Sequence, residues 1–184
     1  MKKKLGAKNL HYPTLTVIVG VNVNEKPNYL TVAWAGILGM DSLYIALGKS
    51  HYSNRGIVEN AAFSINIPSV KLVKETDYCG MYSGRKVDKS NVFKTFYGKL
   101  GNAPMIEECP VNMECKLVQK IEFNDHDIFI GKINETYCGS EFMTDHKPDL
   151  MKIQPILFSF IDSTYWEIGN GFAKAWSVGK DLKK

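Results

Sequence analysis

The chain has 184 residues, of which 45% are apolar and 23% charged, and its formal net charge is +4. These values are typical of a globular domain and exclude a disordered chain, a collagen-like chain and a coiled coil. The longest apolar runs, 15–23 and 156–161, have the length of strands and fall short of the ~20 residues that a membrane-spanning helix needs. We therefore predict one domain over residues 1–184, with no membrane partner.

Most of the positive charge lies at the two ends of the chain. Six lysines and one aspartate fall within residues 1–4 and 180–184, and without them the formal charge is −1. We expect residues 1–8 and 180–184 to be flexible ends, as lysine-rich termini usually are. The rest of the chain lacks the basic stripe of a nucleic-acid-binding protein. The beginning also lacks the apolar segment of a signal peptide, so we expect a cytoplasmic protein.

The first third of the chain favours β-structure. Residues 14–22 are rich in β-branched side chains and predict a strand, and residues 24–28 (NEKPN) predict a turn. A second strand is expected over 29–38 and a third over 43–47. The connections are too short for crossover helices, so these three strands are expected to form an antiparallel meander.

Helical and strand signals then alternate. Residues 49–60 predict a short helix with Ser50 or Ser53 as its N-cap, and residues 63–67 predict a strand that Pro68 ends. A second helix, capped by its first residue, is expected over 69–79.

The second half of the chain contains a long excursion and three further strands. Residues 80–104 are rich in glycine and lysine without clear periodicity, and long loops of this kind often carry function. Strands are expected over 111–119, 128–137 and 156–161, followed by an aromatic and glycine-rich end. The whole pattern predicts a mainly β protein, a barrel or a sandwich, with two or three short helices.

The four cysteines, Cys79, Cys109, Cys115 and Cys138, form no C-x-x-C pair. The four histidines are scattered as well. We therefore expect no metal site and reduced, mostly buried thiols. Cys79 is expected to be a packing residue, because no second cysteine lies near it in the sequence.

One candidate binding segment is KSHYSNR at 49–55, which follows a strand and opens a helix. A helix N-terminus presents free N–H groups and a positive dipole end. The hydroxyls of Ser50 and Ser53, with Lys49 or Arg55, would complete a cradle for phosphate. The alternative is an ordinary N-cap with solvated basic neighbours.

Three further segments could contact a ligand. The strand at 28–34 offers backbone groups and an indole at Trp34, although Trp34 could equally belong to the core. His126 at a strand start is either a turn residue or a site residue. The loop at 83–89 offers cations on flexible backbone or is simply a solvated loop. No G-x-S-x-G, P-loop or G-x-G-x-x-G motif in a dinucleotide-binding context accompanies them.

Taken together and in this order, these segments resemble the flavin reductase-like family of FMN-binding split barrels, and its flavoredoxin branch most closely. The resemblance is carried by KPNYLTVAWAG at 26–36, LGKSHYS at 47–53, NAAFSINIPS at 60–69, DYCGMYSGRKVDK at 77–89, ECPVNMEC at 108–115, NDHDIFIGKI at 124–133 and AKAWSVGK at 173–180. It extends over nearly the whole chain, and the segment at 77–89 and the strand followed by KSHYS are its most specific parts.

The resemblance implies a Greek-key split β-barrel, a homodimer, and one non-covalent FMN per subunit near the dimer interface. By position, the flavin ring is expected against Asn28, Thr31, Val32, Ala33 and Trp34. The ribityl phosphate is expected at Lys49, Ser50, Tyr52 and Ser53. Lys89 and His126 match positions near the isoalloxazine, and Lys89 is the candidate to favour the anionic form of reduced flavin.

Two positions depart from the family pattern. Members that use NADH commonly carry Gly-Asp-His where this chain has Asn124, Asp125 and His126, which leaves the use of a pyridine nucleotide open. His51 stands where flavoredoxin-like relatives often have arginine, and Arg55 is the candidate to compensate for the missing charge.

The sequence therefore predicts an FMN-binding oxidoreductase that passes hydride or electrons through its flavin. Two mechanisms remain open: an NAD(P)H:flavin reductase, or a flavoredoxin-like electron carrier fed by a ferredoxin-type donor. No side chain is assigned as an acid or base, because the redox steps belong to the flavin. The alternative is a non-catalytic β-barrel binding module, for example a single-strand nucleic-acid binder with aromatic platforms. The near-neutral body argues against nucleic acid as a partner.

Overall fold

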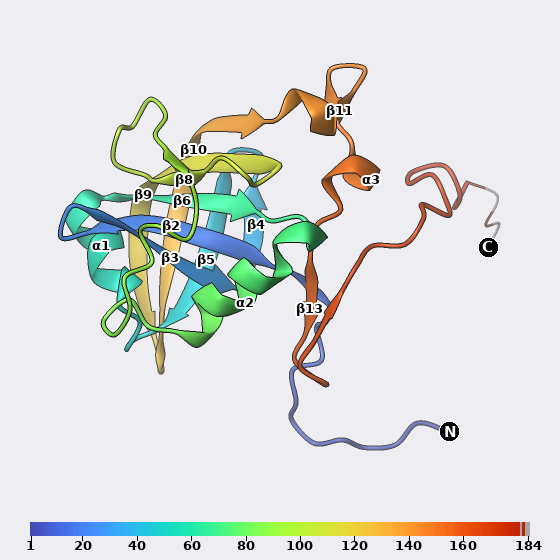
Figure 1. Cartoon of the computed structure of the whole chain (residues 1–184). Helices are drawn as coiled ribbons and strands as arrows, with labels where there is room; N and C mark the ends of the chain where they lie inside the picture. Colours follow the sequence, from blue (N-terminus) through green and yellow to red (C-terminus); the bar gives the residue numbers. More distant parts are fainter. Residues whose placement is uncertain (181, 183–184) are drawn as a thin grey trace.

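A computed structural model describes residues 1–180 and 182, and its main feature is a seven-stranded antiparallel sheet rolled into a split barrel (Figure 1). The sheet order is β3-β2-β6-β9-β10-β5-β4, so β3 and β4 are its two edges. The strands are β2 (Val17–Val23), β3 (Lys26–Val32), β4 (Ala35–Gly39), β5 (Ser42–Gly48), β6 (Ala62–Ile67), β9 (Val111–Phe123) and β10 (His126–Cys138). This confirms the predicted mainly β split barrel.

Smaller elements surround the barrel. Strands β1 (Thr14–Leu15), β13 (Leu157–Ser159) and β14 (Thr164–Trp166) form a second sheet, and two short ladders join β7 (Thr95–Phe96) to β8 (Met105–Ile106) and β11 (Met143–Thr144) to β12 (Lys147–Pro148). The α-helices are α1 (Ser53–Asn60), α2 (Val73–Met81) and α3 (Leu150–Ile153), with 3-10 turns η1 (Val70–Leu72) and η2 (Ser140–Phe142). The first two helices were predicted, whereas α3 was not.

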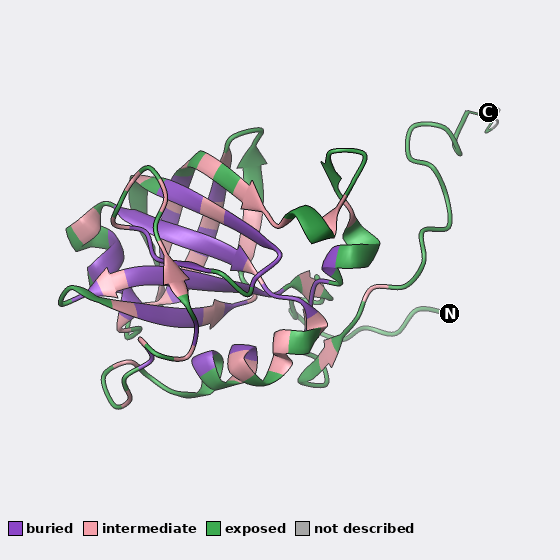
Figure 2. Ribbon diagram, turned by 45° about the horizontal axis from the view of Figure 1, so that its top comes forward, coloured by how far each residue is buried: buried purple, intermediate pink, exposed green. Residues whose placement is uncertain are grey.

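The core fills the barrel between its strands (Figure 2). Strand β5 shows how the pattern is set: Leu43, Ile45 and Leu47 are buried, while Tyr44 and Ala46 between them face outward. Alternation of this kind gives one apolar face to the core and leaves the other free to line a surface cavity. The same alternation in β10 buries Asp127 and Phe129 and turns His126 outward.

The predicted single strand over 29–38 and the predicted meander are both wrong. The chain leaves the ladder at Ala33, so β3 ends at Val32 and β4 begins at Ala35. The two strands lie at opposite edges of the sheet, because β3 pairs only with β2 and β4 pairs with β5. The short connections correctly indicate the hairpins β2–β3 and β4–β5. They do not determine whether the two hairpins lie next to each other in the sheet.

Several boundaries also differ from the prediction. The β2–β3 turn is only Asn24 and Glu25, both with positive φ, and Pro27 belongs to β3. An edge strand tolerates a proline, because the missing N–H faces away from the ladder. The predicted strand over 14–22 is interrupted between β1 and β2, where the N–H of Thr16 bonds to the carbonyl of Ile156.

The predicted cap of the first helix is wrong, and the predicted cap of the second has the right residue without a side-chain bond. Helix α1 begins at Ser53, its N-cap is Tyr52, and no side chain caps it. The Ser53 hydroxyl instead accepts a hydrogen bond from the Asn28 amide, at 2.9 Å. The helix predicted over 69–79 starts as the turn η1, and its N-cap Ser69 makes no side-chain cap.

Cys79, Cys109 and Cys115 are buried and Cys138 is half-buried, and all four are free thiols, as predicted. Burial raises the pKa of Cys79 to about 11, which suits a packing residue. Within residues 1–180 and 182, no helix is long and apolar enough to cross a membrane. The same residues bring together no group of three or more His, Cys, Asp or Glu side chains that could hold a metal ion.

Candidate functional site

Two cavities open along β3, one at each end of the strand. The polar cavity, about 340 Å³, is lined by Val23, Asn24, Lys26, Pro27, Asn28, Tyr52 and residues 84–89. The aromatic cavity, about 370 Å³, is lined by Thr31, Val32, Ala33, Trp34, Ala46, Leu47, Gly48, His51, His126, Phe158 and Phe160. Strand β3 thus connects a cationic site to an aromatic one.

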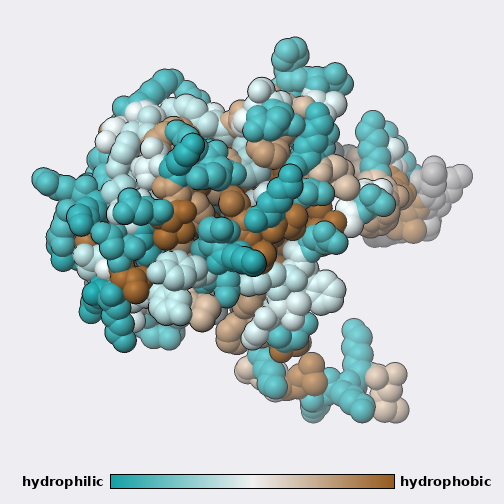
Figure 3. Space-filling model, viewed as in Figure 1, coloured by the Kyte–Doolittle hydropathy of each residue, from teal (hydrophilic) through white to brown (hydrophobic). Residues whose placement is uncertain are grey.

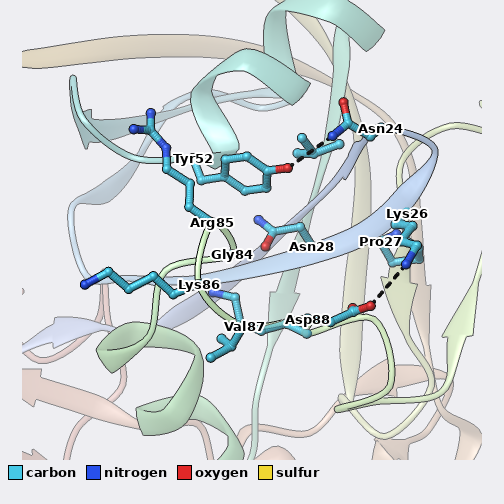
Figure 4. A pocket seen from close by; sticks show the side chains of 12 residues that line it. Asn24, Lys26, Pro27, Asn28, Tyr52, Gly84, Arg85, Lys86, Val87 and Asp88 are labelled. Carbon is cyan, nitrogen blue, oxygen red and sulfur yellow. Dashed lines mark hydrogen bonds and ion pairs between the residues drawn. The ribbon is translucent and has the colours of Figure 1, made fainter.

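The polar cavity lies between the start of β3 and the loop that follows α2 (Figure 4). Lys26 and Asp88 form an ion pair at 3.3 Å that ties this loop to the strand. Hydrogen bonds from the hydroxyl and N–H of Ser90 lower the pKa of Asp88 to about 2, and the Lys26 ammonium contributes to the same shift. Four cationic side chains and one carboxylate line the cavity, so its chemistry favours an anion.

Lys89 lies at the inner wall of the polar cavity. It is 2% exposed, and its ammonium donates to the carbonyls of Cys79 at 3.2 Å and Tyr82 at 2.9 Å, at the end of α2. Burial lowers its pKa. None of the ion pairs among the described residues involves Lys89, so this buried cation has only carbonyl partners in the chain. Such a group is well placed to attract a negatively charged ligand.

The turn between β5 and α1 borders the same region. Asn28 and Ser53 are buried and hydrogen-bonded to each other, and the Tyr52 hydroxyl accepts from the Asn24 amide at 3.4 Å. Lys49 and Ser50 are at this turn but line neither cavity, and Lys49 pairs with Glu122 at 3.7 Å.

Arg55 was the proposed substitute for missing charge near this turn. Its guanidinium bonds to Asn24 at 2.8 Å and pairs with Glu59 at 3.3 Å, close to the Tyr52 ring. The Arg55 guanidinium is therefore already engaged by Asn24 and Glu59, and is not a free charge at this turn.

Trp34 forms the outer wall of the aromatic cavity. It is 43% exposed, and its ring centroid lies 4.8 Å from that of His126, so Trp34 does not belong to the core. His126 in turn bonds through Nδ1 to Asp125 at 2.7 Å. At the inner end the Thr31 hydroxyl donates to the carbonyl of Thr76 in α2, which fixes β3 against that helix. A planar ring would find an indole, an imidazole and phenyl rings here.

His51 lines the aromatic cavity and has a perturbed pKa. Burial lowers its pKa, and the positive charges of His126 and Lys89 lower it further. The lowered pKa favours the neutral imidazole, which lines the aromatic cavity together with His126.

Comparison with known proteins identifies the family of the chain. Residues 10–158 match the flavin reductase like domain. The chain belongs to the flavin reductase-like family. Its fold matches that of the flavoredoxin from Methanosarcina acetivorans, with 39% identity, TM-score 0.96 and all of both chains covered. It also matches the flavoredoxin of Desulfovibrio vulgaris (Miyazaki F), with 38% identity, TM-score 0.91, and 98% of this chain and 100% of that one covered.

A third solved structure, the FMN-binding protein from Thermus thermophilus, shares the fold at 22% identity, with TM-score 0.80 and 95% of this chain and 97% of that chain covered. This flavin reductase-like chain is therefore a flavin-binding oxidoreductase or electron carrier of the flavoredoxin branch. The alternative of a non-catalytic nucleic-acid-binding module gains no support.

The structure brings most of the predicted site residues of this flavin reductase-like chain together. Asn28, Tyr52 and Lys89 line the polar cavity, and Thr31, Val32, Ala33, Trp34 and His126 line the aromatic one. Ser53 reaches the polar cavity through Asn28, whereas Lys49 and Ser50 lie outside both.

Among the cavity-lining residues that sequence reasoning did not assign to the site are Arg85, His51, Phe158 and Phe160. Arg85 and His51 stood inside segments that had been singled out, so their signal was present. Phe158 and Phe160 had none, because β13 follows β3 by more than a hundred residues and only the fold places it beside Trp34.

Proposed function

We propose that the chain binds one FMN per subunit, with the phosphate end at the polar cavity and the ring at the aromatic cavity. The observation that supports this is the pairing of the two cavities along β3, which matches a ligand with a dianionic tail and a planar head. The buried Lys89, whose partners in the chain are all carbonyls, adds a specific attraction for negative charge. The name of the Thermus thermophilus relative is consistent with FMN.

The side chains have distinct roles in this proposal. Trp34 and His126, whose rings contact each other, would pack against one side of the flavin ring. Asn28, Tyr52 and Ser53 would position the polyol and phosphate at the start of α1, with Lys49 and Ser50 at the outer side of the turn. Lys89, which lines the polar cavity, would attract the phosphate end of the ligand rather than the N1 and O2 edge of the ring that the family resemblance implies. Bound FMN would supply the redox chemistry, accepting hydride or electrons at N5.

The source of those electrons defines two versions of the function. One is an NAD(P)H:flavin reductase and the other is an electron carrier reduced by a ferredoxin-type protein. Anaerobic stopped-flow mixing with NADH, NADPH and reduced ferredoxin separates them by the rate at which the flavin absorbance bleaches. The match to two flavoredoxins and the Asn124 departure favour the carrier, so we expect reduced ferredoxin to be the fast donor.

We further propose that the protein is a cytoplasmic homodimer. Free thiols suit a reducing compartment. Several apolar side chains of the β4–β5 hairpin and of the C-terminal residues 167–180 are exposed, among them Ile37, Met40, Phe172 and Trp176. Figure 3 shows apolar side chains exposed between polar ones on the face that it views. A second subunit would cover such residues.

The visible spectrum of freshly purified protein tests the FMN proposal, followed by reconstitution of the apoprotein with FMN, FAD and riboflavin. We expect a flavin spectrum and the tightest binding for FMN. A colourless protein that binds none of the three would contradict the proposal, and a preference for FAD would correct the cofactor.

A further inference from the structure

A buried carboxylate lies beneath the β5–α1 turn, and the proposed function does not use it. Asp127 is the second residue of β10 and is 5% exposed. Because side chains alternate along the strand, Asp127 points to the interior while its neighbour His126 lines the aromatic cavity. Asp127 is therefore close to the site without facing it.

Asp127 is connected to the turn by a short series of hydrogen bonds. Its Oδ2 accepts from the Asn54 amide at 3.3 Å, and the same amide nitrogen donates to the carbonyl of Gly48 at 3.1 Å. Gly48 is the last residue of β5 and Asn54 is the second residue of α1. The two hydrogen bonds thus join both ends of the turn to β10.

The backbone reinforces the same connection. The N–H of Lys49 donates to the carbonyl of Asp125 at 3.0 Å, and the N–H of His51 donates to the carbonyl of Gly48 at 3.0 Å. The conformation of residues 48–53 therefore depends on Asp125, in the turn just before β10, as well as on Asp127.

The charge of Asp127 is balanced locally. Lys120 lies 3.2 Å from its Oδ2 and also 3.4 Å from Glu122, while Glu122 pairs with Lys49. Two cations and two carboxylates make a neutral group, so Asp127 does not repel an anion bound at the turn.

Two buried oxygens in this network have no protein partner: Oδ1 of Asp127 and Oδ1 of Asn54. Leaving buried acceptors unpaired is unfavourable for folding. The stability of the folded state alone therefore does not explain why Asp127 and Asn54 are buried together at this position.

We propose that Asp127 is a positioning residue that acts through Asn54 to hold the 48–53 turn in the conformation that receives the flavin phosphate. The inference rests on the proposed function, because it takes the phosphate to lie at this turn. In its absence Asn54 would keep only its bond to the Gly48 carbonyl and lose its connection to β10, and the backbone N–H groups at the start of α1 would be less well preorganised. The flavin ring would be affected less, because Gly48 and His51 of the turn line the aromatic cavity but Trp34 and the residues of β3 do not depend on the turn.

The experiment compares FMN with riboflavin, which has the same ring but no phosphate. Dissociation constants for both are measured on apoprotein with the wild-type sequence and with Asp127→Ala, Asn54→Ala and Asp127→Asn. We expect wild-type protein to prefer FMN, and both alanine variants to lose about tenfold or more of that preference, because riboflavin binding falls less than FMN binding. Asp127→Asn keeps an acceptor for Asn54 and should restore most of the preference.

Glu114→Ala is the matched control. Glu114 is a fully buried carboxylate on β9 that accepts from the N–H groups of Lys99 and Leu100, far along the chain from the turn. This variant should lose stability without changing the ratio of the two dissociation constants. The ratio therefore separates positioning of the phosphate from a general loss of folding.

Three results would overturn the inference. Equal losses for FMN and riboflavin in the Asp127 and Asn54 variants would show a structural role only, and an unchanged ratio in both would show no role at the turn. Wild-type protein that binds both ligands equally would overturn the proposed phosphate site itself, and that result is visible before any variant is made. If Asp127→Ala does not fold, Asn54→Ala carries the same comparison.

Discussion

Lys89 is a buried cation whose partners in the chain are all carbonyls, and this makes it the residue most dependent on the ligand. Replacing it with methionine keeps its length and removes its charge. We expect Lys89→Met to weaken FMN binding by about tenfold to a hundredfold, because a charge-assisted hydrogen bond contributes ~1.5–3 kcal/mol. Apoprotein stability should change little, since losing two hydrogen bonds is offset by no longer burying a charge.

Fluorescence titration with FMN and urea unfolding of the apoprotein measure the two effects of Lys89→Met. Lys86→Met is the control, because Lys86 belongs to the same loop and lines the same cavity but is exposed. Equal losses of affinity in the two variants would mean that the cavity acts only through its overall charge.

His51 makes stability depend on pH. Its pKa is lowered in the folded protein by burial and by the nearby charges of His126 and Lys89, whereas the unfolded chain keeps a value near 6.5. Below that pH the unfolded chain binds the proton first, so the folded state loses stability as the pH falls. His51→Gln should flatten this dependence.

The measurement is urea unfolding of the apoprotein on either side of the ordinary histidine pKa. The exposed His146 provides the control, since His146→Gln should leave the slope as it is in the wild-type protein. A slope that survives in His51→Gln would assign the pH dependence to other groups.

At the scale of elements, the sequence located the strands well but not their neighbours. The apolar alternation of β5 and the β-branched residues of β2 were sufficient to predict both, because they reflect which face is buried. The break between β3 and β4 could not be predicted, because Ala33 and Trp34 are compatible with a continuous strand. Only the closure of the barrel places β3 and β4 at opposite edges of the sheet.

The candidate site could likewise be predicted only where its residues are close in sequence. Residues of the site that are close in sequence, such as Thr31 and Trp34 or Tyr52 and Ser53, could be predicted from local motifs. The neutral group formed by Lys49, Lys120, Glu122 and Asp127 could not, because it depends on the register between β9, β10 and the turn.

The loop over the start of β3 is positioned by close packing at Gly84. A Cβ on this residue would collide with the Asn28 amide and the Tyr52 ring. Gly84→Ala should displace the loop from β3 and weaken FMN binding by about tenfold, the effect expected when overpacking costs ~1–3 kcal/mol. Titration with FMN measures this loss, and Gly171→Ala, where a Cβ meets nothing, should have no effect. Unchanged binding in Gly84→Ala would show that the loop can shift without opening the site.

At the scale of the whole molecule, the two ends of the chain leave the barrel on the same side, away from α1 (Figure 1). Residues 1–12 and 167–180 are nearly all exposed, although the prediction of flexible ends for residues 181, 183 and 184 lies outside the described residues. Phe172 and Trp176 are 99% and 97% exposed and lie four residues apart. Among the described residues, no surface of the same chain covers these two aromatic rings. A second copy of the chain would cover them.

Removing the two rings should therefore weaken the proposed homodimer. Burial of a large apolar side chain contributes ~1.5–3 kcal/mol, so Phe172→Ser and Trp176→Ser should each raise the dimer dissociation constant by about tenfold or more. Sedimentation equilibrium measures the constant, with Val58→Ser on the opposite side, at the outer face of α1, as the control. If the dimer is as tight in both variants as in the wild-type protein, the subunits meet elsewhere, and the exposed β4–β5 hairpin becomes the surface to test. A wild-type protein that sediments as a monomer would contradict the homodimer itself.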